Sequence, residues 1–332
     1  MIEAAVPAPG QGRLALVLGV NGQDGSYLAE QLLQSGWLVL GVGRQAGSRW
    51  LPEDSPGYRY RCLDLTDDAS LSALLRETAP GAIFHFAAVH GSAGFDYESQ
   101  WRAVHAVNTL SAHAILEYLR CHAPETVFVY ASSSKVFRTA AGGVINESSP
   151  RESSCIYSTT KNAATDLIAY YRKQHGLKAS VVWTFNHESP RRGSSYFIPR
   201  IVSALAGAIM DPGFVGSIAS LSFWSDWSDA RDFMLATSRI AVQAAGQDFV
   251  LASGNTLWAE DFVAALYARY GLSYRQHLQV RYPMQGERPA AFHADTRLLH
   301  QRIDCPPMRP ALAIAEDILR SCHAQAWARL KA

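Results

Sequence analysis

The chain has 332 residues, of which 48% are hydrophobic, and a formal net charge of +1. It is long enough for a large buried core, and the balanced charge indicates neither nucleic acid nor an anionic membrane as a partner. No apolar stretch reaches the length of a membrane-spanning helix. The five cysteines are scattered and form no C-x-x-C pair, which predicts a reduced, cytoplasmic protein without a disulfide framework or a structural metal. Residues 1–12 do not resemble a signal peptide and are expected to form a flexible leader.

A glycine-rich turn follows the first predicted strand. Residues 14–33 read LALVLGVNGQDGSYLAEQLL, which is the pattern of a buried strand, a turn and a helix with leucines on one face. This order places backbone N–H groups and a helix N-terminus where they can bind a pyrophosphate. Gly19 permits the tight turn, Gly22 the close approach of the phosphate, and Gly25 the packing of the helix on the strand. The G-x-x-G-x-x-G spacing predicts a dinucleotide site and is typical of short-chain dehydrogenases/reductases.

The segments that follow alternate between strands and helices. Strands are predicted over residues 37–42, 58–63, 82–88, 126–132, 179–185 and 249–253, and helices over 69–77, 101–120 and 158–175. Such alternation predicts right-handed crossovers and therefore an α/β protein with a doubly wound parallel sheet of the Rossmann type. We expect a Rossmann domain over 13–185, with a returning segment near 226–255, and a smaller substrate-binding region over 186–225 and 256–332.

The end of the second predicted strand indicates which nicotinamide dinucleotide is bound. An NAD site usually has an acidic residue there, which accepts hydrogen bonds from the ribose hydroxyls. Here the strand is followed by Arg44, and an arginine can pair with a 2′-phosphate through two hydrogen bonds. The sequence therefore favours NADP over NAD, unless Arg44 is only a solvated surface residue. Asp64, after the third strand, either binds the adenine amino group or caps its own loop.

Tyr157 and Lys161 are four residues apart, which places them one above the other on a predicted helix. An ammonium group near a phenol stabilises the phenolate and brings the tyrosine into a useful range for proton transfer. Ser133, at the end of a predicted strand, can share a substrate oxygen with Tyr157. We therefore predict that Ser133, Tyr157 and Lys161 form a catalytic triad for hydride transfer. Asn108, in the long helix, either supports the lysine through backbone or water contacts or lies on the helix surface.

With these motifs the chain resembles the extended short-chain dehydrogenases that modify nucleotide sugars, and within them the GDP-mannose 4,6-dehydratase family. The resemblance covers about residues 13–320. It rests on the glycine turn and on DLTD at 64–67, FNHESPRRG at 185–193, DWSDARDF at 226–233 and RPA at 288–290. It implies an NADP cofactor, a nucleotide-diphosphate sugar as substrate, with a GDP-hexose favoured, and a homodimer or homotetramer.

The resemblance also implies binding residues. Asn186 and Arg200 would contact the sugar nucleotide, Arg288 would lie near its diphosphate, and Arg191 and Arg192 would lie near the cofactor and pyrophosphate. Ion pairs between loops are the alternative for each arginine. The expected cofactor site consists of Gly19, Gly22, Gln23, Asp24, Gly25, Arg44, Asp64, Leu65, Ala87, Tyr157, Lys161, His187 and Arg192, and the expected substrate site of Ser133, Asn186, Arg200 and Arg288.

The sequence departs from the family pattern just after the triad serine. Family dehydratases carry Thr-Ser-Glu-Leu-Tyr where this chain reads SSKVF at 133–137, so Lys135 replaces the glutamate that removes the proton beside the C4 ketone. A lysine must be neutral to act as a base, which requires desolvation or a nearby cation to lower its pKa from about 10. The arginine that precedes Asp-Trp in the family is Ser225 here, and the basic loop after the second strand is short.

Three functions follow from this departure. In the first, the protein is a dehydratase in which Lys135 is the fourth catalytic residue; a group of inverting dehydratases resembles this site in having a lysine near this point. In the second, the base step is lost and the protein is a C4 oxidoreductase or an epimerase of a nucleotide sugar. In the third, it only binds NADP and a sugar nucleotide, although a binding protein has no need of the Tyr157–Lys161 pair.

Overall fold

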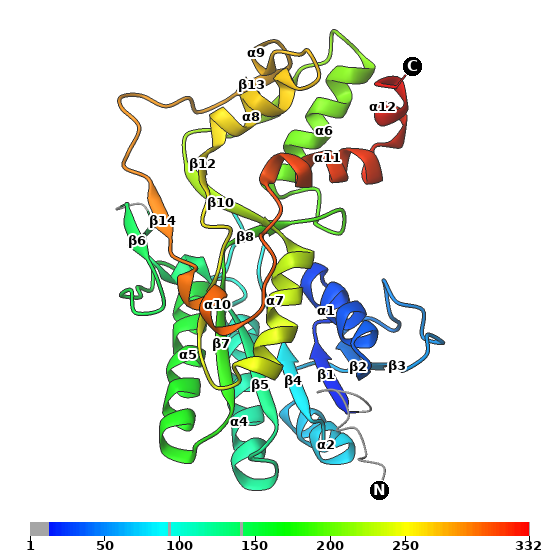
Figure 1. Cartoon of the computed structure of the whole chain (residues 1–332), viewed down its shortest axis with the longest axis vertical. Coiled ribbons are helices and arrows are strands. Elements are labelled where there is room, and N and C mark those ends of the chain that lie inside the picture. Colours follow the sequence, from blue (N-terminus) through cyan, green and yellow to red (C-terminus); the bar gives the residue numbers. More distant parts are fainter. Residues whose placement is uncertain (1–12, 92–93, 140–141, 332) are drawn as a thin grey trace, which may run out of the picture.

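A seven-stranded sheet forms the centre of the molecule (Figure 1). The computed structural model describes residues 13–91, 94–139 and 142–331, so the predicted leader lies outside the described residues. All neighbouring strands of this sheet run parallel. Their order is β11-β7-β5-β4-β1-β2-β3, which confirms the predicted Rossmann-type sheet. The strands are β1 (Leu14–Leu18), β2 (Leu38–Gly43), β3 (Tyr58–Cys62), β4 (Ala82–His85), β5 (Val127–Ser133), β7 (Ala179–Thr184) and β11 (Phe249–Leu251).

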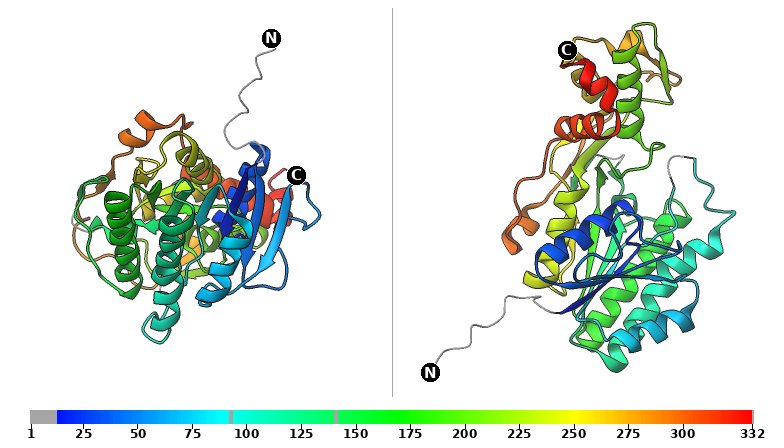
Figure 2. Two further views of the ribbon diagram at one scale, coloured as in Figure 1. Left: turned by 90° about the horizontal axis from the view of Figure 1, so that it is seen from below. Right: turned by 90° about the vertical axis from the view of Figure 1, so that its right-hand side faces the viewer.

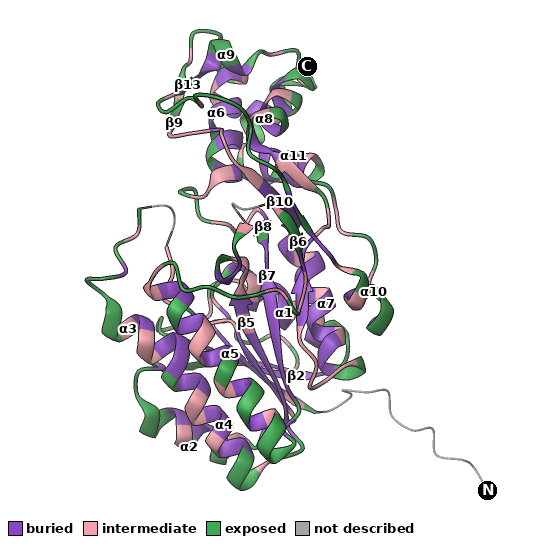
Figure 3. Ribbon diagram, turned by 90° about the vertical axis from the view of Figure 1, so that its left-hand side faces the viewer, coloured by how far each residue is buried: buried purple, intermediate pink, exposed green. Residues whose placement is uncertain are grey.

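Helices cover both faces of this sheet (Figure 2). On one face α1 (Gln23–Gln34) packs against α7 (Ala230–Gln243), and on the other α4 (Ser111–His122) lies between α2 (Asp68–Thr78) and α5 (Ile156–His175). Because both faces are covered, the central strands are almost continuously apolar and largely buried (Figure 3). Side chains such as Leu16, Phe84 and Phe128 are fully buried. In the described part of the chain, no helix is long and apolar enough to span a membrane.

The helix predicted over residues 101–120 is not a regular α-helix. It consists of α3 (Trp101–His105), the π-helical turn η1 (Ala106–Leu110) and α4. Asn108 lies in this turn and is fully buried, so of the two alternatives for this residue the one that places it on the helix surface is wrong. Its Oδ1 accepts from the backbone N–H of Val89 at 3.1 Å, and its Nδ2 donates to Thr160 Oγ1 at 3.2 Å. The turn therefore ties the loop after β4 to α5.

A second group of elements lies beyond the carboxyl edge of the sheet (Figure 1). We call α6, α8, α9, α11 and α12, together with β9 and β13, the C-terminal lobe; side chains including Leu205, Leu266 and Ile314 form its own apolar core. These elements are α6 (Phe197–Met210), α8 (Ala259–Ala268), α9 (Tyr274–His277), α11 (Ala311–Cys322), α12 (Ala324–Arg329), β9 (Gly216–Ile218) and β13 (Leu278–Val280).

Short strands connect the lobe to the sheet. A three-stranded sheet contains β8 (Asn186–Glu188), β10 (Trp224–Asp229) and β12 (Thr256–Trp258), and a two-stranded sheet contains β6 (Gly143–Ile145) and β14 (Phe292–Ala294). Of the segment expected to return to the Rossmann domain, β11 is a strand of the central sheet and α7 packs against that sheet, whereas β10 belongs to the three-stranded sheet. After β14, α10 (Arg297–Arg302) packs beside β11.

A cluster of ion pairs holds α11 against the start of α7. Asp229 is fully buried and caps the N-terminus of α7. Arg231 pairs with Asp229 at 2.6 Å and also with Asp317 of α11 at 2.5 Å. Arg309 pairs with Asp229 at 3.2 Å and with Asp232 at 2.6 Å. Three residues of the DWSDARDF run at 226–233 therefore connect the C-terminal lobe to the sheet.

Candidate active site

Two adjoining cavities lie along the carboxyl edge of the sheet, between β1 and β4, where the strand order changes direction. Such an edge is the usual ligand site of open α/β sheets. The first cavity has a volume of about 240 Å³ and the second about 270 Å³, and Gly19, Gly22, Phe86 and Ala88 border both. A single extended ligand could therefore pass from one cavity to the other over the glycine turn.

Two positions of the glycine turn, Gly19 and Gly25, have no room for a side chain. A Cβ atom at Gly19 would lie 2.6 Å from the backbone nitrogen of Ala87, and one at Gly25 would lie 2.4 Å from the carbonyl oxygen of Gly19. Gly19 also has a φ of +88°, which favours glycine. Gly22 is the N-cap of α1 and supplies no side-chain cap, so the first-turn amides are available to an anion. These features fit the pyrophosphate of a dinucleotide.

The first cavity fits the adenosine end of such a ligand. Arg44 and Gln45 line it, and so do Leu63, Leu65 and Ala87. Asp64 does not line it; its Oδ1 accepts from the backbone N–H of Thr66 at 2.9 Å, which is the loop-capping alternative.

Asn21, which we did not single out in the sequence, organises the wall of this cavity. Its Nδ2 donates to the carbonyl of Gly47 at 3.0 Å and to Gln45 Oε1 at 3.1 Å. Its Oδ1 accepts from the backbone N–H of Arg49 at 2.8 Å. A polar residue inside a glycine turn could have pointed to this role. Its partners, however, lie in a loop after the next strand, and the sequence around Asn21 does not reveal them.

Ser133, Tyr157 and Lys161 all line the second cavity. Lys161 Nζ donates to the carbonyl of Ala131 at 2.7 Å and lies 5.7 Å from the centroid of the Tyr157 ring. Burial lowers the pKa of Lys161 to about 7. Burial also raises the pKa of Tyr157 well above its ordinary value, with the Ser133 hydroxyl acting in the opposite direction. The lysine can therefore gain or lose charge near neutral pH beside the phenol of Tyr157.

Asn108 does not reach this lysine directly. Its carbonyl accepts a hydrogen bond from the hydroxyl of Tyr130, and the ring of Tyr130 lies 4.5 Å from Lys161 Nζ. The ring of Tyr130 thus lies between the carbonyl of Asn108 and the ammonium group of Lys161, where the sequence suggested a backbone or water contact.

Lys135 also lines the second cavity, from the short turn η2 (Ser134–Val136) that follows β5. Its Nζ is 5.9 Å from the centroid of the Tyr157 ring. Desolvation by the surrounding protein lowers the pKa of Lys135 from its ordinary value, although nearby Cys155 acts in the opposite direction. Lys135 therefore combines a place in the lining of the cavity with a lowered pKa.

A buried ion pair links the glycine turn to β8. His187 Nε2 lies 2.9 Å from Asp24 Oδ1, and His187 Nδ1 lies 2.7 Å from the carbonyl oxygen of Phe185. Both neighbours accept hydrogen bonds, so the ring donates from both nitrogens and is an imidazolium. Burial would raise the pKa of Asp24, but His187, Arg192 and Gln23 together act in the opposite direction and the pKa falls to about 2. Burial likewise opposes the positive charge of His187, but Asp24 raises its pKa above the ordinary value.

Arg192 closes the second cavity from the loop after β8. Its guanidinium lies 3.6 Å from the centroid of the Tyr196 ring and its Nε 3.4 Å from Glu188 Oε2. Burial raises the pKa of Glu188 to about 7. Gln23, Asp24, His187 and Asn186 line the same cavity, and Asn186 Nδ2 donates to Ser225 Oγ at 2.7 Å.

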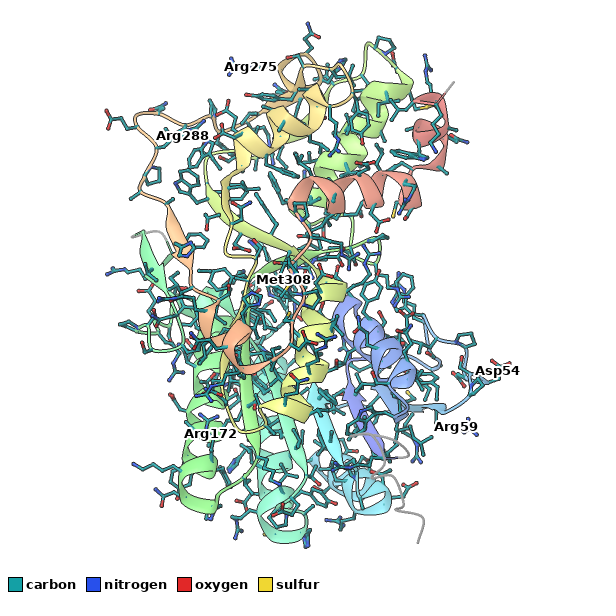
Figure 4. The ribbon with its side chains drawn as sticks, viewed as in Figure 1. Asp54, Arg59, Arg172, Arg275, Arg288 and Met308 are labelled. Atoms are coloured by element: carbon teal, nitrogen blue, oxygen red, sulfur yellow. The ribbon has the colours of Figure 1, made fainter. Side chains whose placement is uncertain are left out.

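The other predicted arginines are not brought to either cavity. Arg191 contacts α1, where it donates to Ser26 Oγ at 2.9 Å and pairs with Glu30. Arg288 makes two hydrogen bonds of 2.7 Å to Asp261 in the C-terminal lobe (Figure 4). Arg200 is exposed on α6. For Arg191 and Arg288 the structure therefore agrees with the alternative of ion pairs between segments.

His90 also lines the second cavity and was not predicted. Its position just beyond the carboxyl end of β4 was a possible signal, because side chains at this edge gather around the ligand. Clusters of three or more potential metal ligands do not occur within residues 13–91, 94–139 and 142–331, and all five cysteines are free.

Comparison with known proteins agrees with this geometry. The family model described as GDP-mannose 4,6 dehydratase matches residues 16–312. The chain is 32% identical over 270 residues to GDP-mannose 4,6-dehydratase of Yersinia enterocolitica, covering 75% of this chain and 70% of that protein. It is 30% identical over 277 residues to the protein of that name from Sinorhizobium fredii, covering 79% and 77%.

Solved structures share the fold at lower identity. One is dTDP-glucose 4,6-dehydratase of Bacillus anthracis in complex with NAD, with a TM-score of 0.77, 17% identity and coverage of 94% of this chain and 97% of that chain. Another is UDP-N-acetylglucosamine 4-epimerase of Methanobrevibacter ruminantium, with a TM-score of 0.79, 16% identity and coverage of 95% and 99%. With a family match over most of its length, the chain belongs to the GDP-mannose 4,6-dehydratase family of nucleotide-sugar enzymes.

Proposed function

We propose that the protein is an NADP-dependent 4,6-dehydratase of a GDP-hexose, with Lys135 in place of the family's glutamate base. The observation that supports this most is the arrangement of the second cavity. Ser133, Tyr157, Lys161 and Lys135 surround it, and it adjoins the glycine turn. A chain that only bound nucleotides would not need a Tyr–Lys pair and a second amine around one cavity.

The residues divide the reaction between them. A nicotinamide dinucleotide held at the glycine turn would supply the hydride chemistry, from C4 in the oxidation and to C6 in the reduction. Ser133 holds the C4 oxygen, and the phenolate of Tyr157, which the charge of Lys161 stabilises, removes the proton from that oxygen. Lys135 removes the proton from C5, which the C4 ketone makes acidic, and returns a proton to the C6 hydroxyl, which leaves as water. The proton that Tyr157 took from the C4 hydroxyl is then transferred to C5, so that the protons balance.

The proposal also specifies the cofactor, NADP, and the substrate, a GDP-hexose. Arg44 at the first cavity, and the lack of an acidic residue beside it, support NADP. The names of the relatives support a GDP sugar. The alternative is a C4 oxidoreductase or an epimerase, which the loss of the glutamate favours.

The experiment is incubation of the purified protein with NADP and GDP-mannose, with the product analysed by mass spectrometry and NMR. We expect a product lighter by one water molecule. A product lighter by two hydrogen atoms would instead identify an oxidoreductase, and an unchanged mass with altered ring couplings an epimerase. If neither GDP-mannose nor other nucleotide sugars react, the proposal is wrong.

A further inference from the structure

His90 occupies a place in the second cavity that the proposed steps do not use. Its ring centroid lies 4.5 Å from that of Tyr157, with 31° between the rings, and its Nδ1 lies 2.6 Å from the hydroxyl of Tyr97. The Tyr97 ring in turn lies 5.7 Å from the Tyr157 ring. Among the described residues, none forms a hydrogen bond with His90 Nε2. This atom is also not one of the buried polar atoms that lack a partner. The histidine is thus held from one side beside the triad tyrosine.

Tyr97 determines which nitrogen of His90 carries the proton. Burial raises the pKa of Tyr97 to about 12, so its hydroxyl keeps its hydrogen at neutral pH; the backbone N–H of Gly91 acts in the opposite direction. We assign the Tyr97 hydroxyl as the donor to Nδ1 of His90, which corresponds to the tautomer of the neutral ring with its hydrogen on Nε2.

The surroundings keep this ring neutral. Burial lowers the pKa of His90 to about 3, and four cationic side chains act in the same direction: Lys135, Arg192, Lys161 and His187. A neutral imidazole remains a hydrogen-bond donor and can stabilise an oxygen that becomes negative during a reaction.

We propose that His90 donates a hydrogen bond from Nε2 to the C4 oxygen of the sugar, as a third donor beside Ser133 and Tyr157. The inference rests on the proposed function. Removal of the C5 proton converts the C4 ketone to an enolate, whose charge lies largely on that oxygen. His90 then stabilises the enolate more than the bound substrate, so its contribution falls on turnover more than on binding. Tyr97 is a positioning residue, because it acts by fixing the tautomer.

The test compares three variants of the full chain. His90→Phe keeps a ring but loses the donor, and His90→Gln keeps an N–H group near the position of Nε2. Tyr97→Phe removes the hydroxyl that holds His90 in one tautomer. His300→Gln serves as the control, because His300 is exposed on α10 and lines neither cavity. The readouts are kcat and KM with GDP-mannose, and Kd values for NADP and GDP-mannose by calorimetry, the latter in the Tyr157→Phe background, where no turnover occurs.

For His90→Phe we expect kcat to fall about 10²-fold or more, with both Kd values within about threefold of the parent. His90→Gln should recover much of this loss, and Tyr97→Phe should lie between wild type and His90→Phe. The inference is overturned if His90→Phe keeps a wild-type kcat, or if His90→Gln is as slow as His90→Phe, since the ring would then act by packing alone. A wild-type protein that converts no nucleotide sugar would instead refute the proposed function, and this inference with it.

Discussion

Lys135 is the residue on which the proposed reaction depends most. It lines the same cavity as Tyr157, and desolvation lowers its pKa. We predict that Lys135→Met lowers dehydration by about 10²–10⁴-fold but still permits oxidation at C4, so that the absorbance of reduced nicotinamide accumulates on mixing with GDP-mannose. Turnover that survives this substitution would make Lys135 a bystander and favour the oxidoreductase or epimerase.

The pH dependence of Lys135 gives a second measurement on the same residue. Only the neutral amine accepts a proton, so activity should rise with pH through the lowered pKa of Lys135. In Lys135→Glu the base is already ionised near neutral pH, because a glutamate loses its proton near pH 4. The rising limb of the kcat profile should therefore move to much lower pH in Lys135→Glu. An unchanged limb would mean that another group controls it.

Arg44 is predicted to select NADP. It lines the first cavity, and a charge-assisted pair with a 2′-phosphate contributes about 1–3 kcal/mol. Arg44→Ala should weaken NADP binding by that amount and leave NAD binding nearly unchanged, and the difference should shrink as salt is added. Calorimetric titration measures this, with Arg49→Ala as a control outside the cavity lining. Equal or tighter binding of NAD by the wild type would contradict the prediction.

At the scale of elements, the Asp24–His187 pair joins the start of α1 to β8. Asp24 has a pKa of about 2 instead of 3.8, so its stabilising effect is present above pH 3.8 and is lost as pH falls towards 2. His187 has a pKa above 6.5, so its effect is present below pH 6.5 and is lost as pH rises through the raised value. The pair should therefore stabilise the fold most between these limits.

A double-mutant cycle measures this window. The coupling free energy between Asp24→Asn and His187→Gln, from urea unfolding at several pH values, should be largest between about pH 4 and 6.5. The exposed pair Arg61–Glu77 is the control, with a small coupling over this range. A coupling that does not change with pH would mean that the two side chains interact as neutral groups.

Elements with strong local signals were predicted from the sequence, and those that depend on distant partners were not. The glycine turn, the strands and the Tyr157–Lys161 spacing are local patterns, and the structure has the sheet that they predict. The π-helical turn at Asn108 depends on contacts with Val89 and Thr160, which lie in other elements. No local pattern reveals those contacts.

The predicted binding residues also depend on contacts that the local sequence does not reveal. A motif gives the position of an arginine along the chain but not its partner. Arg191 turns to Glu30 of α1 and Arg288 to Asp261 of α8, because these carboxylates come within reach only in the folded molecule. His90 was missed for a related reason: its place beside Tyr157 is created by the packing of the loop after β4 against α5.

At the scale of the whole molecule, the second cavity lies where the sheet meets the segments that lead to the C-terminal lobe. Arg231 contacts both Asp229 and Asp317, so it holds these parts together. Arg231→Met would leave the buried Asp229 with its helix-capping hydrogen bond and its longer ion pair to Arg309, and we predict a loss of about 3 kcal/mol in the free energy of unfolding. Arg320→Met, which removes an exposed partner of Asp317, should cost less than about 1 kcal/mol. Similar costs in urea unfolding would contradict the connecting role of Arg231.

The most direct test of the central claim, that this chain dehydrates a nucleotide sugar by transient oxidation at C4, follows a deuterium atom placed at C4 of GDP-mannose. The proposed reaction moves this atom to C6 of the same sugar, in a product that has lost one water molecule and carries solvent hydrogen at C5. NMR of the product locates the deuterium. Deuterium that returns to C4, or that is lost from the sugar without the loss of water, would contradict the claim.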